Sequence, residues 1–118
     1  MSNEIFGLKT CDTCRKARKA LDEAGVDYAY TDVRTDGVST KDLTNWVSAL
    51  GWEKVLNKSS TTWRGLDEAD KEGLDDKKAV ALMADHPTLI KRPVIVRDGM
   101  DVTVGWSKEV QERLLKGD

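Results

Sequence analysis

Apolar residues recur along the chain with two different periods, which divide its first third into a strand, a helix and a second strand. The apolar run at 5–8 predicts a strand, and apolar spacings of three and four at 12–24 predict an amphipathic helix that Gly25 ends. The aromatic and β-branched run at 27–33 predicts the second strand. Because the three elements follow one another closely, they predict a βαβ unit with parallel strands and a right-handed crossover.

The middle of the chain, about residues 39–85, shows only helical periodicity. Ser39 begins a predicted helix, and its apolar positions recur at helical spacing as far as Leu50. A polar loop is expected at 58–62. Further helical segments are expected at 52–56, 66–72 and 76–85. This part of the chain therefore predicts a helical insertion.

The last quarter of the chain returns to a strand pattern. The apolar runs at 93–96 and 102–104 are joined through Asp98-Gly99, a dipeptide typical of hairpins, so they predict an antiparallel pair. A last helix begins at Ser107, with three apolar residues expected on its inner face: Val110, Leu114 and Leu115. The order βαβ, helices, ββα predicts a single α/β domain over 1–118 with a four-stranded mixed sheet.

Composition and charge narrow the classes of partner. The 118 residues include 19 Lys and Arg and 21 Asp and Glu, with both signs mixed along the chain and a net charge of −2, so nothing favours nucleic acid. No apolar run approaches the roughly 20 residues that span a bilayer. Residues 1–4 lack the basic and apolar regions of a signal peptide. We therefore expect a cytoplasmic protein that binds neither nucleic acid nor membrane.

Both cysteines, Cys11 and Cys14, lie where the first strand ends and the first helix begins. A Cys-x-x-Cys at such a junction is typical of a thioredoxin-like redox motif. The helix N-terminus favours a thiolate at Cys11, and Lys9 and Arg15 add positive charge nearby, whereas Asp12 opposes it. Cys14 lies one turn further on the same helix face, so it could act as a resolving thiol.

Other interpretations of the cysteines stay open at this point. Both could be small buried residues with no chemistry. Zinc is less favoured, because two cysteines and the single His86 fall short of the four ligands of a structural site, so we expect no metal. His86 stands at the end of a predicted helix, where a capping role is the more frequent one. In a reducing cytoplasm a close cysteine pair is more often catalytic than a structural disulfide.

Arg92 and Pro93 form the second informative motif. A proline that opens a strand lacks an N–H group and tolerates a cis bond, and the fixed charge of Arg92 could hold a thiolate, a carboxylate or an oxyanion. The alternative is an edge proline beside a surface arginine. Trp52 and Trp63 could line a groove, although packing is the commoner use, and residues 61–64 could bind an anion or form a solvated loop.

The chain resembles the ArsC/Spx family of arsenate-reductase-like proteins over nearly its whole length, most closely the YffB-like branch. The stretches that carry the likeness are Gly7–Thr13, Gly51-Trp52, Leu56-Asn57, Thr61–Arg64 and Leu89–Val94. The resemblance implies a thioredoxin-like fold with a helical insertion, in which a cis Pro93 faces the active cysteine. It further implies that Cys11 is the nucleophile and that Arg92 lies close to it as a supporting arginine.

For the YffB-like branch, the resemblance implies a glutathione-dependent thiol reductase. Glutathione or a small thiol mixed disulfide would be the partner molecule, and no tightly bound cofactor is expected. Cys11 would attack the disulfide, and either Cys14 or glutathione would resolve the product. Contacts to the substrate are expected from residues that flank the motifs: Lys9, Thr10, Arg15, Arg64, Lys91 and Pro93.

Two other functions follow from the same resemblance. Arsenate reductases of the family use three arginines around the cysteine, and here Arg92 matches one, while the other two would fall near Asn57 and near Gly105, neither of which is an arginine. Arsenate is then a poor substrate unless Lys58 or Arg64 substitutes.

Spx regulators also carry Cys-x-x-Cys followed by a basic run, as in residues 11–18 here, and they bind RNA polymerase with the disulfide as a switch. The pair of cysteines therefore keeps a redox-switched regulator as the alternative to an enzyme.

Overall fold

The computed structural model describes residues 3–99 and 101–115, and the chain forms two compact units. The first contains Met1–Asp32 and Arg92–Asp118, and the second contains Val33–Lys91. The elements of the first unit are β1 Asn3–Gly7, α1 Asp12–Glu23, β2 Ala29–Asp32, β3 Val94–Arg97, β4 Asp101–Val104 and α7 Lys108–Leu115. The single domain over 1–118 stays a prediction.

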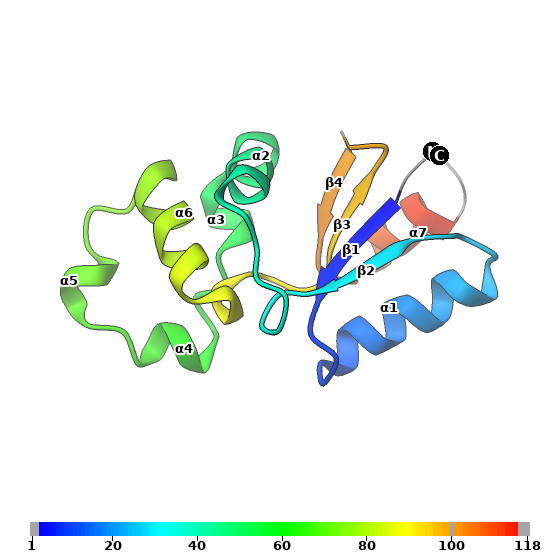
Figure 1. Cartoon of the computed structure of the whole chain (residues 1–118), viewed down its shortest axis with the longest axis horizontal. Coiled ribbons are helices and arrows are strands. Elements are labelled where there is room, and N and C mark those ends of the chain that lie inside the picture. Colours follow the sequence, from blue (N-terminus) through cyan, green and yellow to red (C-terminus); the bar gives the residue numbers. More distant parts are fainter. Residues whose placement is uncertain (1–2, 100, 116–118) are drawn as a thin grey trace. The chain divides into compact units, whose positions relative to one another are not determined.

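The first unit is built on one four-stranded sheet with the order β2-β1-β3-β4 (Figure 1). Strands β1 and β2 are parallel, whereas β3 pairs antiparallel with both β1 and β4. Asp98 and Gly99 follow β3 with φ values of 53° and 72°, in the left-handed region that tight hairpins use. The predicted α/β class with a mixed, thioredoxin-like sheet of βαβ and ββα halves is therefore confirmed.

Both helices of the first unit cover the same face of the sheet. Ile5 of β1 and Ile95 of β3 lie opposite each other in register, and they form one buried cluster with Leu21 of α1 and Leu114 of α7. The expectation that Leu115 shares this inner face is wrong, since its side chain is 37% exposed. One further residue turns the side chain by about 100° around the helix, away from Leu114.

The second unit is helical, as the periodicity of 39–85 predicts. Its elements are α2 Thr40–Leu50, α3 Trp52–Val55, α4 Thr61–Arg64, α5 Glu68–Lys71, α6 Asp76–Asp85 and the 3₁₀ turn η1 Pro87–Leu89. Ser39 caps α2, because its Oγ accepts a hydrogen bond from the Asp42 N–H at 3.0 Å. Helices α2 and α6 pack side by side through apolar residues (Figure 1): Leu43, Trp46, Val47, Ala79, Leu82 and Met83.

One segment of the second unit differs from the expected loop. Residues 61–64 form a helical turn, because Ser60 Oγ accepts a hydrogen bond from the Trp63 N–H at 3.1 Å and so caps it. At the other end of the unit, the His86 N–H donates to the Leu82 carbonyl at 2.8 Å as the C-cap of α6. The capping role predicted for His86 is thus confirmed.

Two stretches far apart in the sequence meet inside the second unit. Leu56 and Ile90 form an antiparallel bridge, and the Lys91 N–H donates to the Val55 carbonyl at 2.8 Å. The Asn57 N–H donates to the Leu89 carbonyl at 2.7 Å. These bonds hold the segment before Arg92 in an extended conformation.

Candidate active site

Cys11 is the first residue of the candidate site, and it caps the N-terminus of α1. Its backbone is extended, with φ −83° and ψ 120°, and its side chain makes no capping hydrogen bond. The Arg15 N–H donates to the Cys11 carbonyl at 3.0 Å, which begins the helix. The thiol therefore stands at the end of α1 where backbone N–H groups point outward and favour negative charge.

The neighbours of Cys11 stabilise its thiolate. Burial alone would raise the pKa of this thiol, but hydrogen bonds from the Cys14 backbone and side chain, together with a hydrogen bond and the positive charge of Arg92, lower the pKa below its ordinary value. The side chain is partly exposed and not in a disulfide. Cys11 thus combines a stabilised thiolate with access to solvent, as a sulfur nucleophile requires.

Cys14 differs from Cys11 in each of these respects. Its side chain is 0% exposed, and burial together with the nearby Cys11 raises its pKa to about 11, although a backbone hydrogen bond from Leu8 and the charge of Arg92 act the other way. It is a free thiol. Two cysteines one turn apart therefore have opposite tendencies, the outer one to ionise and the inner one to keep its proton.

The loop between β1 and α1 is held by a buried carboxylate. Asp32, at the end of β2, is 5% exposed, and its Oδ2 accepts a hydrogen bond from the Lys9 N–H at 3.0 Å. The Cys11 N–H donates to the Leu8 carbonyl at 3.1 Å and closes the turn. The exposed side chains of Lys9 and Thr10 thus flank Cys11, as their place in the sequence implies.

Arg15, which was expected to add positive charge near Cys11, pairs with an acidic residue of its own helix. Its guanidinium forms an ion pair with the Asp12 carboxylate on the exposed side of α1. Arg92 supplies positive charge that lowers the pKa of Cys11. The ion pair also offsets the negative charge of Asp12, which would otherwise oppose a thiolate at Cys11.

Arg92 and Pro93 directly precede β3, in the same unit as the cysteines. The peptide bond between them is cis, and Pro93 is buried, with its carbonyl accepting a hydrogen bond from the Gly105 N–H at 2.9 Å. Gly105 has φ 80°, in the left-handed region. An arginine at position 105 would therefore be strained.

The other two predicted contact residues, Arg64 and Lys91, belong to the second unit. Arg64 is exposed, and its guanidinium donates to the Ser59 carbonyl at 3.3 Å. Lys91 is half-buried, with its backbone bonded to Val55. The structure brings Cys11, Cys14 and Arg92 together within the first unit, and it gives Arg64 and Lys91 partners of their own in the second.

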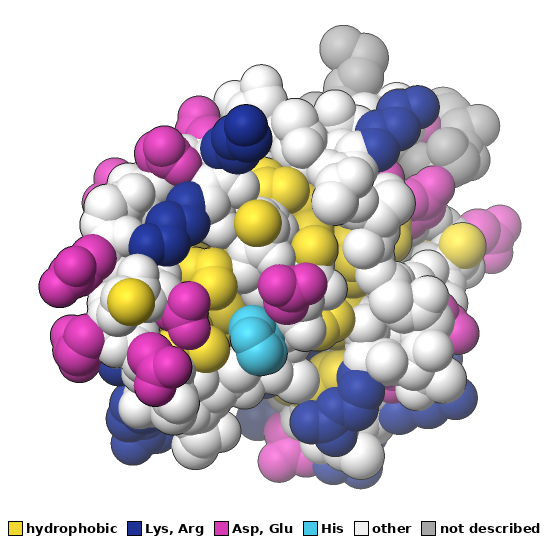
Figure 2. Space-filling view, turned by 60° about the vertical axis from the view of Figure 1, so that its left-hand side comes forward, with side chains coloured by type: hydrophobic (Ala, Val, Ile, Leu, Met, Phe, Trp, Pro, Cys, Tyr) yellow, Lys and Arg dark blue, Asp and Glu magenta, His cyan; other side chains and the backbone are white. Residues whose placement is uncertain are grey.

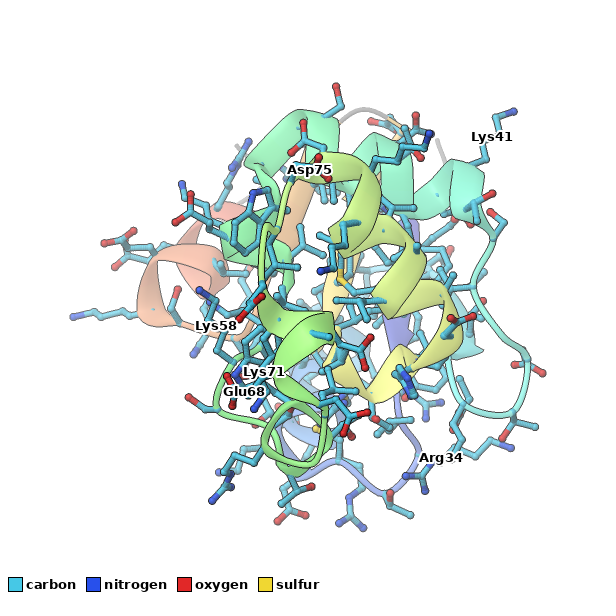
Figure 3. The ribbon with its side chains drawn as sticks, turned by 90° about the vertical axis from the view of Figure 1, so that its left-hand side faces the viewer. Arg34, Lys41, Lys58, Glu68, Lys71 and Asp75 are labelled. Atoms are coloured by element: carbon cyan, nitrogen blue, oxygen red, sulfur yellow. The ribbon has the colours of Figure 1, made fainter. Side chains whose placement is uncertain are left out.

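Trp52 and Trp63 of the second unit carry lysine side chains on their rings. Lys58 Nζ lies 5.2 Å from the ring centre of Trp52 and 5.8 Å from that of Trp63, and Lys71 Nζ lies 5.5 Å from that of Trp63. Figure 3 labels Lys58 and Lys71 in neighbouring places, with Glu68 beside Lys71. These contacts favour packing over an open aromatic groove, and they engage the ammonium of Lys58.

Gly7 is a residue of this region that the sequence analysis did not single out. A Cβ at Gly7 would lie 2.6 Å from Cys14 Sγ and 3.1 Å from Tyr30 Oη. The absence of a side chain is therefore what lets α1 place its inner cysteine against β1. A lone glycine inside a predicted strand is the signal that could have shown this close approach.

Charges of both signs are spread over the surface. Figure 2 shows Lys and Arg interspersed with Asp and Glu on the face that it displays, with hydrophobic side chains between them.

Over residues 3–99 and 101–115, no three His, Cys, Asp or Glu side chains gather in a way that could hold a metal ion. Nor does that part of the chain contain a helix with the length and hydrophobicity to cross a bilayer.

Replacing Arg92 with alanine is expected to raise the pKa of Cys11 toward its ordinary value, because the thiolate loses a hydrogen bond and a positive charge. The alkylation rate of Cys11 by iodoacetamide at pH 7 should fall by roughly three- to tenfold, and its pH profile should move to higher pH. Arg15→Ala is the matched control and should change the rate less, since Arg15 pairs with Asp12. A profile indifferent to Arg92 would contradict this assignment.

The sequence and the fold of this chain are similar to those of known proteins. The sequence matches the model of the ArsC family over residues 6–114. A solved structure named YFFB (PA3664) protein is 40% identical with a TM-score of 0.91, covering 97% of this chain and 99% of its own. An arsenate reductase (ArsC) related protein from Brucella melitensis is 37% identical with a TM-score of 0.75, covering 98% and 96%. The global transcriptional regulator Spx of Streptococcus pyogenes is 28% identical over 97% of this chain and 85% of its own length.

Proposed function

This chain belongs to the ArsC family, and from that premise we propose that it is a glutathione-dependent thiol reductase. The observation that carries this function is the environment of Cys11. The residue stands at the N-cap position of α1, and its thiol is partly exposed and has its pKa lowered by Cys14 and Arg92. Such a thiol is a ready nucleophile toward a disulfide at neutral pH.

The reaction begins with a mixed disulfide of glutathione and a second thiol. The Cys11 thiolate attacks the glutathione sulfur, a bond forms between these two sulfurs, and the second thiol leaves as a thiolate that takes up a proton from water. The substrate disulfide is thereby reduced, and Cys11 is oxidised to its own mixed disulfide with glutathione.

Two routes return Cys11 to its thiol. In one, the Cys14 sulfur attacks Cys11 after losing its proton, the Cys11–Cys14 disulfide forms, and glutathione leaves as a thiolate that is then protonated. Two further glutathione molecules reduce that disulfide and become glutathione disulfide. In the other, glutathione attacks the mixed disulfide directly. Either way, the electrons come from glutathione, which is a substrate and not a bound cofactor.

A redox-switched regulator is the second candidate. Both cysteines of the Cys-x-x-Cys pair are present as free thiols, and the likeness to an Spx regulator spans 97% of this chain. In that function, oxidation of Cys11 and Cys14 to a disulfide would alter a docking surface for RNA polymerase. No turnover would be required of either cysteine.

Arsenate reduction is the least supported of the three functions. Of the three arginine positions, only Arg92 is an arginine, and the backbone of Gly105 disfavours one. Asn57 uses its side-chain oxygen to accept a hydrogen bond from the Ser59 N–H at 3.0 Å. An oxyanion needs several charge-assisted donors, and these positions supply few. A location in the cytoplasm stays a prediction for all three functions.

Turnover and polymerase binding separate the first two candidates. The reduced protein is expected to reduce a glutathione mixed disulfide of a small thiol, such as that of 2-hydroxyethanethiol, at a rate that depends on glutathione concentration. Glutathione disulfide is the product to measure, with arsenate as a parallel substrate. The oxidised and reduced protein are also passed over immobilised RNA polymerase. Absence of turnover together with oxidation-dependent binding would reject the reductase and support the regulator.

A further inference from the structure

The resolving step makes a demand on Cys14 that its surroundings oppose. Cys14 must act as a thiolate to attack Cys11, yet its side chain is 0% exposed and its pKa is raised to about 11. A sulfur anion formed in a buried place needs a hydrogen-bond donor. The Leu8 backbone hydrogen bond and the charge of Arg92 lower the pKa of Cys14, but burial and Cys11 outweigh them.

Tyr30 places a hydroxyl group at this point. It lies on β2 opposite Ile5 of β1, and its Oη and the Cys14 sulfur both lie within 3.1 Å of the place where a Gly7 side chain would begin. No side chain fills that place, so the phenol and the sulfur border one small gap. Tyrosine and cysteine come from different elements and converge here only because β1 carries a glycine between them.

The hydroxyl of Tyr30 has no other role among the described residues. Its oxygen is buried and makes no hydrogen bond within that part of the chain. A buried hydroxyl without a hydrogen-bond partner lowers stability, so its presence here needs an explanation. The pKa of Tyr30 is raised to about 12, first by burial and then by Cys14, so the hydroxyl keeps its proton at neutral pH and can donate it in a hydrogen bond.

Arg18 fixes the tyrosine ring in place. It follows Cys14 by four residues on α1 and therefore lies on the same side of the helix, with its guanidinium carbon 4.1 Å from the centre of the Tyr30 ring. A cation over a phenol draws electron density from the ring and makes the hydroxyl a better donor. The other ionisable groups that act on Tyr30 are Asp32 and Cys11, and Cys11 and Arg92 act on Cys14.

We propose that the Tyr30 hydroxyl donates a hydrogen bond to the Cys14 sulfur whenever that sulfur is anionic. One such moment is the attack on the Cys11 mixed disulfide, and the other is the departure of Cys14 when the Cys11–Cys14 disulfide is reduced. This role depends on Cys14 being the resolving thiol of the proposed reductase. In the reduced protein Cys14 is a neutral thiol and a weak acceptor, so the proposed role requires no hydrogen bond from Tyr30 to its sulfur in that state.

A two-step reaction with Ellman's reagent tests this role without glutathione. Cys11 attacks the reagent, forms a mixed disulfide with the coloured thiol, and releases one equivalent of that thiol. Cys14 then attacks Cys11, forms the Cys11–Cys14 disulfide and releases the second equivalent. The first phase reports Cys11 and the second reports Cys14, and Cys14→Ser should lose the second phase alone.

Tyr30→Phe is expected to slow the second phase by roughly three- to tenfold and to leave the first unchanged, which corresponds to the loss of one hydrogen bond to a charged group. Tyr28→Phe is the matched control, because Tyr28 also lies beside Arg18 but is not at the Gly7 gap, and both phases should keep their rates. The unfolding free energy of Tyr30→Phe should be unchanged or higher, since the hydroxyl makes no bond in the reduced protein.

Two results would overturn the role of Tyr30. One is an unchanged second phase in Tyr30→Phe, and the other is a wild-type protein without any second phase, since Cys14 then resolves nothing. Equal slowing of both phases would also reject it, because that would indicate a general structural change. Failure to turn over glutathione mixed disulfides, with a second phase that still depends on Tyr30, would reject the proposed substrate and leave this role standing.

Discussion

Replacing Cys11 with serine is expected to lower the turnover of a glutathione mixed disulfide by at least about a thousandfold. A serine hydroxyl stays protonated at neutral pH and cannot form the sulfur–sulfur bond on which the reaction depends. The other thiol, Cys14, is 0% exposed and has a raised pKa, so it cannot take over the attack. The protein should stay folded, because Cys11 is partly exposed.

Replacing Cys14 with serine is the matched comparison and should cost no more than about tenfold. The backbone N–H at position 14 still reaches the Cys11 sulfur, the serine hydroxyl supplies a donor in place of the thiol, and glutathione can resolve the mixed disulfide. Cys14→Ala lacks the side-chain donor, so the pKa of Cys11 should be higher in Cys14→Ala than in Cys14→Ser.

The measurement is the initial rate of glutathione disulfide formation at fixed glutathione concentration, with far-ultraviolet circular dichroism to confirm folding. Cys11→Ser with near wild-type turnover would reject Cys11 as the nucleophile. Equal loss in Cys11→Ser and Cys14→Ser would mean that glutathione cannot resolve the mixed disulfide and that Cys14 is indispensable.

Replacing Gly7 with alanine is expected to lower the unfolding free energy by about 1–3 kcal/mol. The new methyl would lie 2.6 Å from Cys14 Sγ, closer than such atoms pack, and a tight 3.1 Å from Tyr30 Oη. Cys14 is on a buried helix face and cannot simply turn away, so α1 must shift against β1. Cys11 stands at the N-cap position of the same helix, so its thiol should lose its lowered pKa along with its alignment to Arg92.

Gly65→Ala is the control for this substitution. Gly65 also has an ordinary backbone conformation, and a Cβ there would lie 3.5 Å from the nearest atom, the Thr61 carbonyl oxygen. It should change stability by less than about 0.5 kcal/mol. Chemical denaturation measures both variants, and Gly7→Ala combined with Cys14→Ala should regain part of the loss. An undiminished stability in Gly7→Ala would show that the contact between β1 and α1 is looser than described.

Most secondary structure could be predicted from local pattern. The helix expected at 12–24 is Asp12–Glu23, and the one at 76–85 has those bounds, because an amphipathic face repeats at helical spacing whatever surrounds it. Short elements were less predictable. Residues 61–64 form a helical turn through a cap at Ser60, since one hydrogen bond decides so short an element.

The candidate site was only partly predictable. The place of Cys11 at a helix N-terminus follows from the order of strand, glycine and helix in the sequence, and Arg92 follows from the family resemblance. Arg15 was expected to favour the thiolate directly, but its guanidinium meets Asp12. On a helix, a side chain can reach residues both three and four positions away, and the spacing alone does not tell which of them it pairs with.

By itself, the sequence determined that two cysteines three positions apart stand at a strand-to-helix junction, which exposes one of them. These are local properties, set by residues within one turn of each other. Only the tertiary structure decided that Arg92 comes within reach of Cys11 and that Tyr30 and Cys14 border the same gap at Gly7. Those neighbours are far apart along the chain, and their meeting depends on strand register and on how closely α1 packs against β1.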